Sequence, residues 1–180
     1  MKIIETNLSG LLVIEPTIFK DTRGYFYESY NKHVFEVHGI KDNFVQDNQS
    51  LSQKNVVRGL HFQHPPFAQA KLVRVIKGAV LDVVVDIRKN SPTYGKTFSI
   101  ELTEDNFLML YIPVGFAHGF ATLEDNTIFA YKCSEFYNKN SEDTILWNDP
   151  TLNIDWKVQN PILSEKDKSG KLFKDFISPF

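Results

Sequence analysis

One stretch in the first half of the chain contains several residues of the types that catalyse reactions or bind ligands. Residues 58–74 hold two histidines, two arginines and a lysine among apolar residues typical of strands: His61, His64, Arg58, Arg74 and Lys71. A cationic cluster with histidine and aromatic neighbours can hold an anion and move a proton. The same residue types can also form a metal site or a plain basic patch, so all three interpretations have to be weighed.

A metal site would draw on His61, His64 and His118. Side chains of a strand alternate between its two faces, so His61 and His64, three residues apart, point in opposite directions unless a bulge intervenes. Pro65 ends the strand directly afterwards, and no His-x-His pair followed by glutamate occurs. The spacing therefore disfavours a metal, and we expect none.

Proton transfer fits the pattern better. A histidine such as His61 can act as a base at neutral pH, although a lone histidine is more often a hydrogen-bonded core residue. Lys71 lies on an expected strand at 71–77 and Tyr131 on one at 127–133, and in a barrel their faces can converge. A base, a cation and a phenol can remove a proton beside a carbonyl, hold the enolate and return the proton elsewhere. Spacing alone leaves this as one possibility among several.

Asp167 has two interpretations. Ser164-x-x-Asp167 resembles a capping box at the start of a short helix, although glutamate or glutamine is the usual third partner. Asp167 could instead orient a base histidine, as carboxylates do in many dyads. From the residues alone, the cap is favoured.

The elements that must position these side chains are strands. Short strands separated by turn residues indicate an all-β sandwich or barrel. We predict strands at 11–14, 25–30, 44–48, 56–63, 71–77, 80–87, 97–102, 107–112, 116–122 and 127–133. A short helix should begin at its N-cap Asn31 and end at Gly39, and another should follow Ser164. The predicted fold is a jelly roll, the double-stranded β-helix of cupin-like proteins, with short peripheral helices.

Composition restricts the class of protein. A length of 180 residues predicts one domain, 1–180, and a net charge of −2 argues against nucleic-acid binding. The apolar run 78–85 is interrupted by Asp82 and is too short to span a membrane. The start lacks the apolar block of a secretory signal, and Cys133 has no partner for an internal disulfide. We therefore expect a soluble cytoplasmic protein.

The segment from Ile3 to Tyr30 is β-rich and aromatic, and the later strands do not obviously need it. An exposed apolar edge strand is a liability unless something pairs with it. Exchange of this segment between subunits would cover it, which predicts a homodimer.

Many sequence blocks follow one another in a specific order. One of these blocks is Arg58-Gly59-Leu60-His61. The others are the segments 21–29, 44–48, 68–75, 83–88, 112–120, 131–132, 147–150, 153–156 and 162–167. With these blocks the chain resembles the dTDP-4-dehydrorhamnose 3,5-epimerases nearly from end to end. The resemblance implies a metal-free, cofactor-free jelly-roll enzyme that epimerises dTDP-4-dehydro-6-deoxy-D-glucose as a homodimer.

The resemblance also implies roles for residues. His61 would remove the protons at C5 and C3, supported by Asp167, while Lys71 would stabilise the enolate oxygen and Tyr131 would be the acid on the opposite face. The nucleotide sugar would also contact Arg23, Glu28, Gln46, Asp47, Asn48, Arg58, His118, Glu142 and Lys166, with Tyr137 stacking on the base and Phe19 and Phe26 lent by the partner subunit. Arg58 and His61 can reach one substrate only if the strand bulges, and Gly59 is the natural place.

Three alternatives remain open. A member of the same family can epimerise only C3 or only C5 of a related nucleotide-linked keto sugar. A metallo-cupin such as a dioxygenase would use His61 and His118, and a sugar-nucleotide-binding module would bind without catalysis. The last two do not require Tyr131 and Lys71 beside the histidine.

Overall fold

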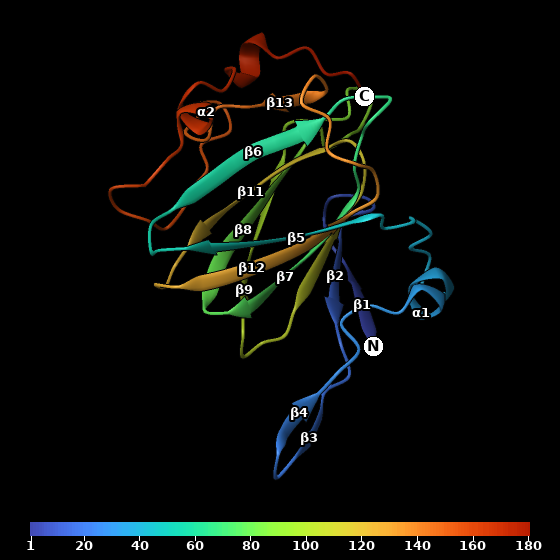
Figure 1. The fold of residues 1–180 in the computed structure, drawn as a ribbon. Coiled ribbons are helices and arrows are strands. Elements are labelled where there is room, and N and C mark those ends of the chain that lie inside the picture. Colours follow the sequence, from blue (N-terminus) through green and yellow to red (C-terminus); the bar gives the residue numbers. More distant parts are fainter.

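Two antiparallel sheets stacked on each other form the body of the computed structural model, which describes all residues 1–180 (Figure 1). The six-stranded sheet has the order β1 (Lys2–Glu5), β2 (Leu12–Glu15), β10 (Met109–Ile112), β7 (Lys71–Lys77), β12 (Thr127–Cys133), β5 (Gln46–Ser52). The five-stranded sheet has the order β13 (Glu142–Thr144), β6 (Val57–Gln63), β11 (Phe116–Thr122), β8 (Ala79–Asp86), β9 (Thr97–Thr103). The predicted all-β jelly roll is confirmed.

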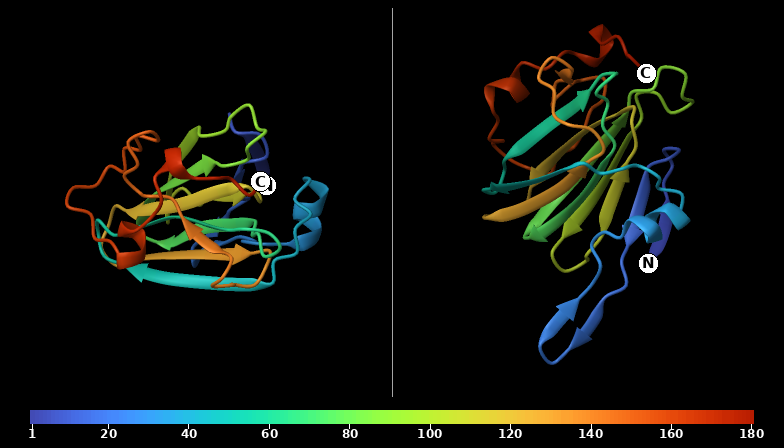
Figure 2. Two further views of the ribbon diagram at one scale, coloured as in Figure 1. Left: turned by 90° about the horizontal axis from the view of Figure 1, so that it is seen from above. Right: turned by 45° about the vertical axis from the view of Figure 1, so that its right-hand side comes forward.

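The remaining elements are small. A hairpin of β3 (Phe19–Asp21) and β4 (Gly24–Phe26) projects well beyond the two sheets (Figures 1 and 2). The helices are α1 (Lys32–Val37), α2 (Glu165–Lys168) and the 3₁₀ turn η1 (Phe173–Asp175). None of them is long and apolar enough to cross a membrane.

The five-stranded sheet is covered on both faces. Every residue of β8 is buried, because Val80 and Val84 pack into the core between the sheets while Leu81, Val83 and Val85 pack against the C-terminal segment. In the sequence, a strand that is buried on both faces is a continuous run of apolar residues. Asp82 interrupts that run and is fully buried.

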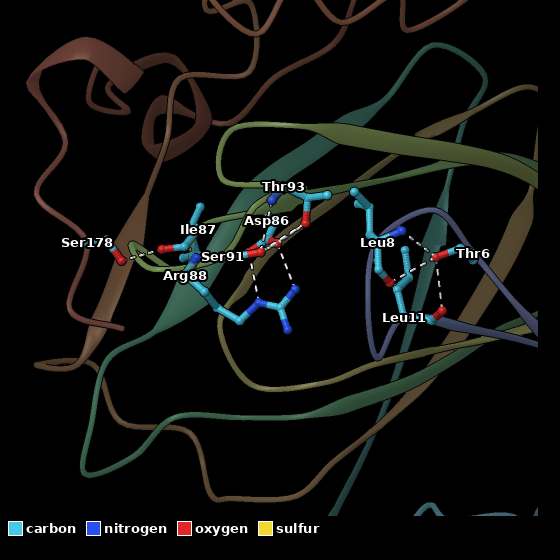
Figure 3. A network of polar contacts seen from close by, with 9 residues as sticks. All are labelled: Thr6, Leu8, Leu11, Asp86, Ile87, Arg88, Ser91, Thr93 and Ser178. Carbon is cyan, nitrogen blue, oxygen red and sulfur yellow. Dashed lines mark hydrogen bonds and ion pairs between the residues drawn. The ribbon is translucent and has the colours of Figure 1, made fainter.

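Polar side chains tie down the loop after β8. The buried carboxylate of Asp86 accepts hydrogen bonds from the side chains of Arg88, Ser91 and Thr93, at 2.6–2.9 Å (Figure 3). Burial alone would raise the pKa of Asp86, but these hydrogen bonds lower it to about 2. Ser178 bonds the carbonyl of Ile87, which anchors the C-terminal segment to the same loop.

Some sequence expectations differ from the structure. The strand predicted at 44–48 begins and ends later, as β5 at Gln46–Ser52. The aromatic run 25–30 is a strand only up to Phe26, because the residues beyond it have no strand partner. Tyr27 instead accepts a hydrogen bond from Arg74, and Tyr30 packs edge-on against Phe35. Strands β1, β3 and β13 were not predicted. The helix cap was predicted correctly, since the side chain of Asn31 accepts the N–H of Val34 at the start of α1.

The register between β6 and β11 is irregular at one point. His118 lies opposite His61, but Phe120 lies opposite Arg58, so β6 carries one extra residue between its two partners. Gly59 lies within this interval at φ +133°, a conformation that favours glycine. The predicted bulge is therefore present, and it turns Arg58 and His61 toward the same side of the strand.

Candidate active site

A cavity of about 550 Å³ lies between the two sheets and collects most of the predicted site residues. Strands β5, β7 and β12 form one wall, and β6 and β11 form the other. The predicted residues that line it are Gln46, Asn48, Arg58, His61, Lys71, His118, Tyr131, Tyr137, Glu142, Lys166 and Asp167. Residues separated by more than 100 positions in the sequence thus share one chamber.

His61 on β6 meets Asp167 on α2. The His61 Nε2 and Asp167 Oδ1 atoms lie 2.8 Å apart, and the same oxygen accepts the backbone N–H of Gly59 at 3.0 Å. The other oxygen, Oδ2, accepts the hydroxyl of Ser164 at 2.5 Å, and the Ser164–Asp167 capping box is complete. Both interpretations of Asp167 therefore hold: the carboxylate caps the helix and contacts the histidine.

The hydrogen bonds fix the protonation of this pair. Burial would raise the pKa of Asp167, but the hydrogen bonds from His61, Ser164 and Gly59 lower it to about 2. An ionised carboxylate only accepts hydrogen bonds, so the Nε2 of His61 carries a proton and its Nδ1 keeps a free lone pair. Burial lowers the pKa of His61, against the opposing effect of the Asp167 hydrogen bond. A neutral imidazole with one free nitrogen is suited to accept a proton.

Lys71 and Tyr131 lie on adjacent strands of the opposite wall. Lys71 on β7 pairs with Cys133 on β12, and Tyr131 is two residues before Cys133. Burial lowers the pKa of the Lys71 amine and raises that of the Tyr131 phenol. A phenol with a raised pKa is protonated at neutral pH and can donate a proton. The histidine and the phenol thus enter the cavity from different sheets.

A second histidine–carboxylate pair forms part of the inner wall. The His118 Nε2 atom lies 2.9 Å from Asp82 Oδ2, and both side chains are buried. Burial raises the pKa of Asp82, opposed by the charge of His118. The ring of His118 stacks on Phe129, which itself stacks on Phe120 with ring centroids 4.1 Å apart. The inner end of the cavity is therefore aromatic and closely packed.

The outer rim carries an exposed aromatic ring held by polar contacts. The Tyr137 hydroxyl donates to Glu142 Oε2 at 3.1 Å, and its backbone N–H donates to Gln46 Oε1 at 2.9 Å. Lys166 forms an ion pair with Glu142. Tyr137 is 55% exposed, so its ring is available to a planar ligand.

Five predicted site residues lie outside this cavity in the single chain. Asp47 points to the other face of β5, where it forms an ion pair with Lys132 at 2.8 Å, because Gln46 and Asn48 occupy the inner face. Arg23 pairs with Asp21, Glu28 accepts from Asn31, and Phe19 and Phe26 are exposed on the projecting hairpin. The four residues other than Asp47 belong to the N-terminal segment that we expect to meet a second subunit.

The cavity also contains residues that sequence reasoning missed: Ser50, Phe120, Phe129 and Ser164 in its lining, and Asp82 behind His118. Ser50 follows Gln46 and Asn48 at the period of two that defines one face of a strand. Asp82 is a charge in an apolar run. Strand alternation was therefore the available signal for Ser50, and the charge within an apolar run was the available signal for Asp82.

No group of three metal-binding side chains comes together in the chain. His61 and His118 are each bonded to a carboxylate. His64 does not line the cavity, and its Nε2 lies 3.8 Å from Asp143.

Known proteins resemble this chain in both sequence and fold. Residues 5–175 match the family model for dTDP-4-dehydrorhamnose 3,5-epimerase. The enzyme of that name from Shigella flexneri is 52% identical over 176 residues, which are 97% of each chain. A crystal structure from Bacillus anthracis with TDP and PPi bound has a TM-score of 0.94 and 48% identity, covering 96% of this chain and 99% of that one. The enzyme from Legionella pneumophila, in complex with dTDP-4-keto-L-rhamnose, has a TM-score of 0.93 and 47% identity, covering 98% and 94%.

Proposed function

Because the chain belongs to the dTDP-4-dehydrorhamnose 3,5-epimerase family, we propose that the cavity between its sheets is the active site and that His61, Lys71, Tyr131 and Asp167 carry the reaction. The reaction is epimerisation of dTDP-4-dehydro-6-deoxy-D-glucose at C3 and C5, giving dTDP-4-dehydro-L-rhamnose. The observation that carries the assignment is the His61–Asp167 pair, at 2.8 Å, in one chamber with Lys71 and Tyr131.

His61 starts each inversion as the base. The ketone at C4 acidifies the hydrogens on its two neighbours, C3 and C5, because the carbanion formed there is an enolate. The free Nδ1 of His61 takes the proton, and the imidazolium that forms is stabilised by the ionised Asp167. No carbon–carbon or carbon–oxygen bond of the sugar breaks.

Lys71 and Tyr131 complete the step. The Lys71 amine stabilises the negative oxygen of the enolate, where charge develops. The Tyr131 phenol then donates its proton to the opposite face of the carbon, which inverts the centre. His61 must lose its proton and Tyr131 must regain one before the second carbon reacts. One base and one acid from opposite walls therefore serve both carbons.

The nucleotide and its diphosphate are held by the remaining lining. Arg58, His118 and Lys166 line the cavity; His118 is buried, whereas Arg58 and Lys166 are exposed at its surface. Arginine and lysine side chains suit a diphosphate, whose charge a mildly acidic protein otherwise repels. Tyr137 provides an exposed ring for stacking on the base, beside the hydrogen-bonding groups of Gln46.

The assembly is a homodimer in this proposal, and residues 1–180 form one domain of it. The hairpin β3–β4 exposes Phe19 and Phe26 by 61% and 65%, and their ring centroids lie 6.5 Å apart. Adjacent exposed apolar rings are typical of an interaction site, which supports a partner at this hairpin. In the dimer this hairpin brings Arg23 and the two phenylalanines to the partner's cavity. We place the enzyme in the cytoplasm, where the free thiol of Cys133 stays reduced.

The experiment that tests the function is turnover in deuterated water. The product should contain deuterium at both C3 and C5, because the returned protons come from groups that exchange with solvent. Nuclear magnetic resonance of the product reads each carbon separately. Incorporation at a single carbon would contradict double epimerisation and would indicate a single-site epimerase.

A further inference from the structure

One buried hydroxyl in the molecule lacks a partner. Ser50 Oγ is the single buried side-chain nitrogen or oxygen that makes no hydrogen bond within the chain. Buried polar atoms are nearly always paired, since leaving one unpaired costs stability. Ser50 also lines the active-site cavity. An unpaired group at that place needs a partner that the chain itself does not supply.

The neighbours of Ser50 define what that partner is. Ser50 lies on the inner face of β5 two residues after Asn48, and its partner across the ladder to β12 is Phe129. Two residues further on, Ser52 accepts Nε and Nη2 of Arg58, each at 3.2 Å, which holds the guanidinium beside β5. The surroundings are thus an aromatic ring, which offers no strong hydrogen bond, and a cation.

We propose that the hydroxyl of Ser50 donates a hydrogen bond to a phosphate oxygen of the substrate's diphosphate, next to Arg58. This inference rests on the proposed function. A serine hydroxyl can donate, an anion held by an arginine offers several acceptor oxygens, and a bond to a charged acceptor is stronger than one between neutral groups. Rotation about the Cα–Cβ bond moves Oγ between staggered positions at little cost, so the hydroxyl can turn into the cavity.

The proposal makes opposite predictions for binding and for folding. Ser50→Ala should weaken dTDP binding about 10- to 100-fold, the loss expected for one hydrogen bond to a charged group. The melting temperature of the free protein should stay the same or rise, because the substitution removes an unpaired buried group. Ser99→Ala on β9, away from the cavity, is the matched control and should change neither quantity.

Calorimetric titration with dTDP and with dTDP-rhamnose, together with thermal melts, decides the question. Equal loss of affinity for both ligands supports the proposal. Unchanged affinity for dTDP overturns it, and loss for dTDP-rhamnose alone overturns it by assigning the hydroxyl to the sugar. A Ser50→Ala protein that melts several degrees lower or fails to fold overturns it by making the hydroxyl structural. A wild-type protein that binds neither ligand would instead remove the proposed function.

Discussion

At the scale of single residues, the carboxylate of Asp167 makes two kinds of contact. Asp167 caps α2 through Ser164 and bonds His61, and the backbone N–H of Gly59 reaches it as well. Its ionised form is therefore maintained by three donors before any substrate binds. The residue that the sequence pattern assigned to a helix cap is the same one that we propose orients the base.

The pH dependence of catalysis follows from this pair. Burial lowers the pKa of His61, so the acid side of the kcat/KM profile should inflect below 6.5. The Asp167 hydrogen bond opposes that shift, so Asp167→Asn should move the inflection lower still and reduce kcat by about 100- to 10,000-fold. Steady-state kinetics between pH 5 and 9 measures both, where Asp167 itself, with a pKa of about 2, does not titrate.

The matched control is Glu165→Gln on the same helix. Glu165 is an exposed acid that pairs only with Lys168 at the surface, so this variant should keep the wild-type profile. An inflection that moves upward in Asp167→Asn, or a kcat within twofold of wild type, would show that Asp167 only caps the helix.

Much of the site follows from alternation in the sequence. Lys71 and Tyr131 were predicted on converging faces because their strands 71–77 and 127–133 are regular, and the structure has strands with those bounds. The contact of Asp167 with His61 is different. It joins residues 106 positions apart through an irregular segment, and no periodicity in the chain specifies such a contact.

At the scale of elements, the extra residue in β6 is what brings the arginine and the base together. A regular strand would send Arg58 and His61 to opposite faces. The backbone of Gly59 passes close to β11, and a Cβ added there would lie 2.5 Å from Gly119 Cα and 2.9 Å from the His118 carbonyl oxygen. The bulge therefore depends on the absence of a side chain at this position.

Gly59→Ala should consequently destabilise the fold and the site together. We expect a loss of about 2–6 kcal/mol, the sum of backbone strain at positive φ and a backbone clash. Gly24→Ala is a matched control, because Gly24 has φ +132° but no atom within 4 Å of its added Cβ. Chemical denaturation of both variants separates strain from crowding. Equal losses in the two variants would contradict the close approach of β6 and β11.

Strands with regular apolar alternation were easier to predict than short strands or segments whose path is set by tertiary contacts. From residue 71 on, the expected strands agree with the structure to within two residues, because turn residues separate clear apolar alternation. Strand β13 has three residues, Glu142–Thr144, and no alternation to detect. The aromatic run after Phe26 looked like a strand because aromatic residues favour sheets, but tertiary contacts of Tyr27 and Tyr30 decide its path.

At the scale of the whole molecule, the proposed dimer should complete each cavity with the partner's hairpin. Arg23→Ala in β3–β4 and His61→Ala in the cavity should each inactivate a homodimer. Each cavity uses its own subunit's His61 and the partner subunit's Arg23. A hybrid dimer of the two variants therefore has one site with both substitutions and one site with neither. After unfolding and refolding an equal mixture, about one quarter of wild-type activity should return, since half of the dimers are hybrids with one intact site.

The control for this experiment is a mixture of each variant with itself. Sedimentation of the wild type at micromolar concentration should show a dimer. A fully active monomer, or a mixture no more active than its components, would contradict a site shared between subunits.

The assignment of base and acid to opposite walls is the central claim, and one comparison tests it most directly. Substrate is incubated in deuterated water with His61→Ala or Tyr131→Phe, and exchange and inversion at C3 and C5 are followed by nuclear magnetic resonance. We predict that His61→Ala abolishes exchange at both carbons. Tyr131→Phe should retain exchange without most inversion, because the base still removes protons and returns them to the same face. Wild-type inversion by Tyr131→Phe, or exchange of both hydrogens by His61→Ala, would contradict the account.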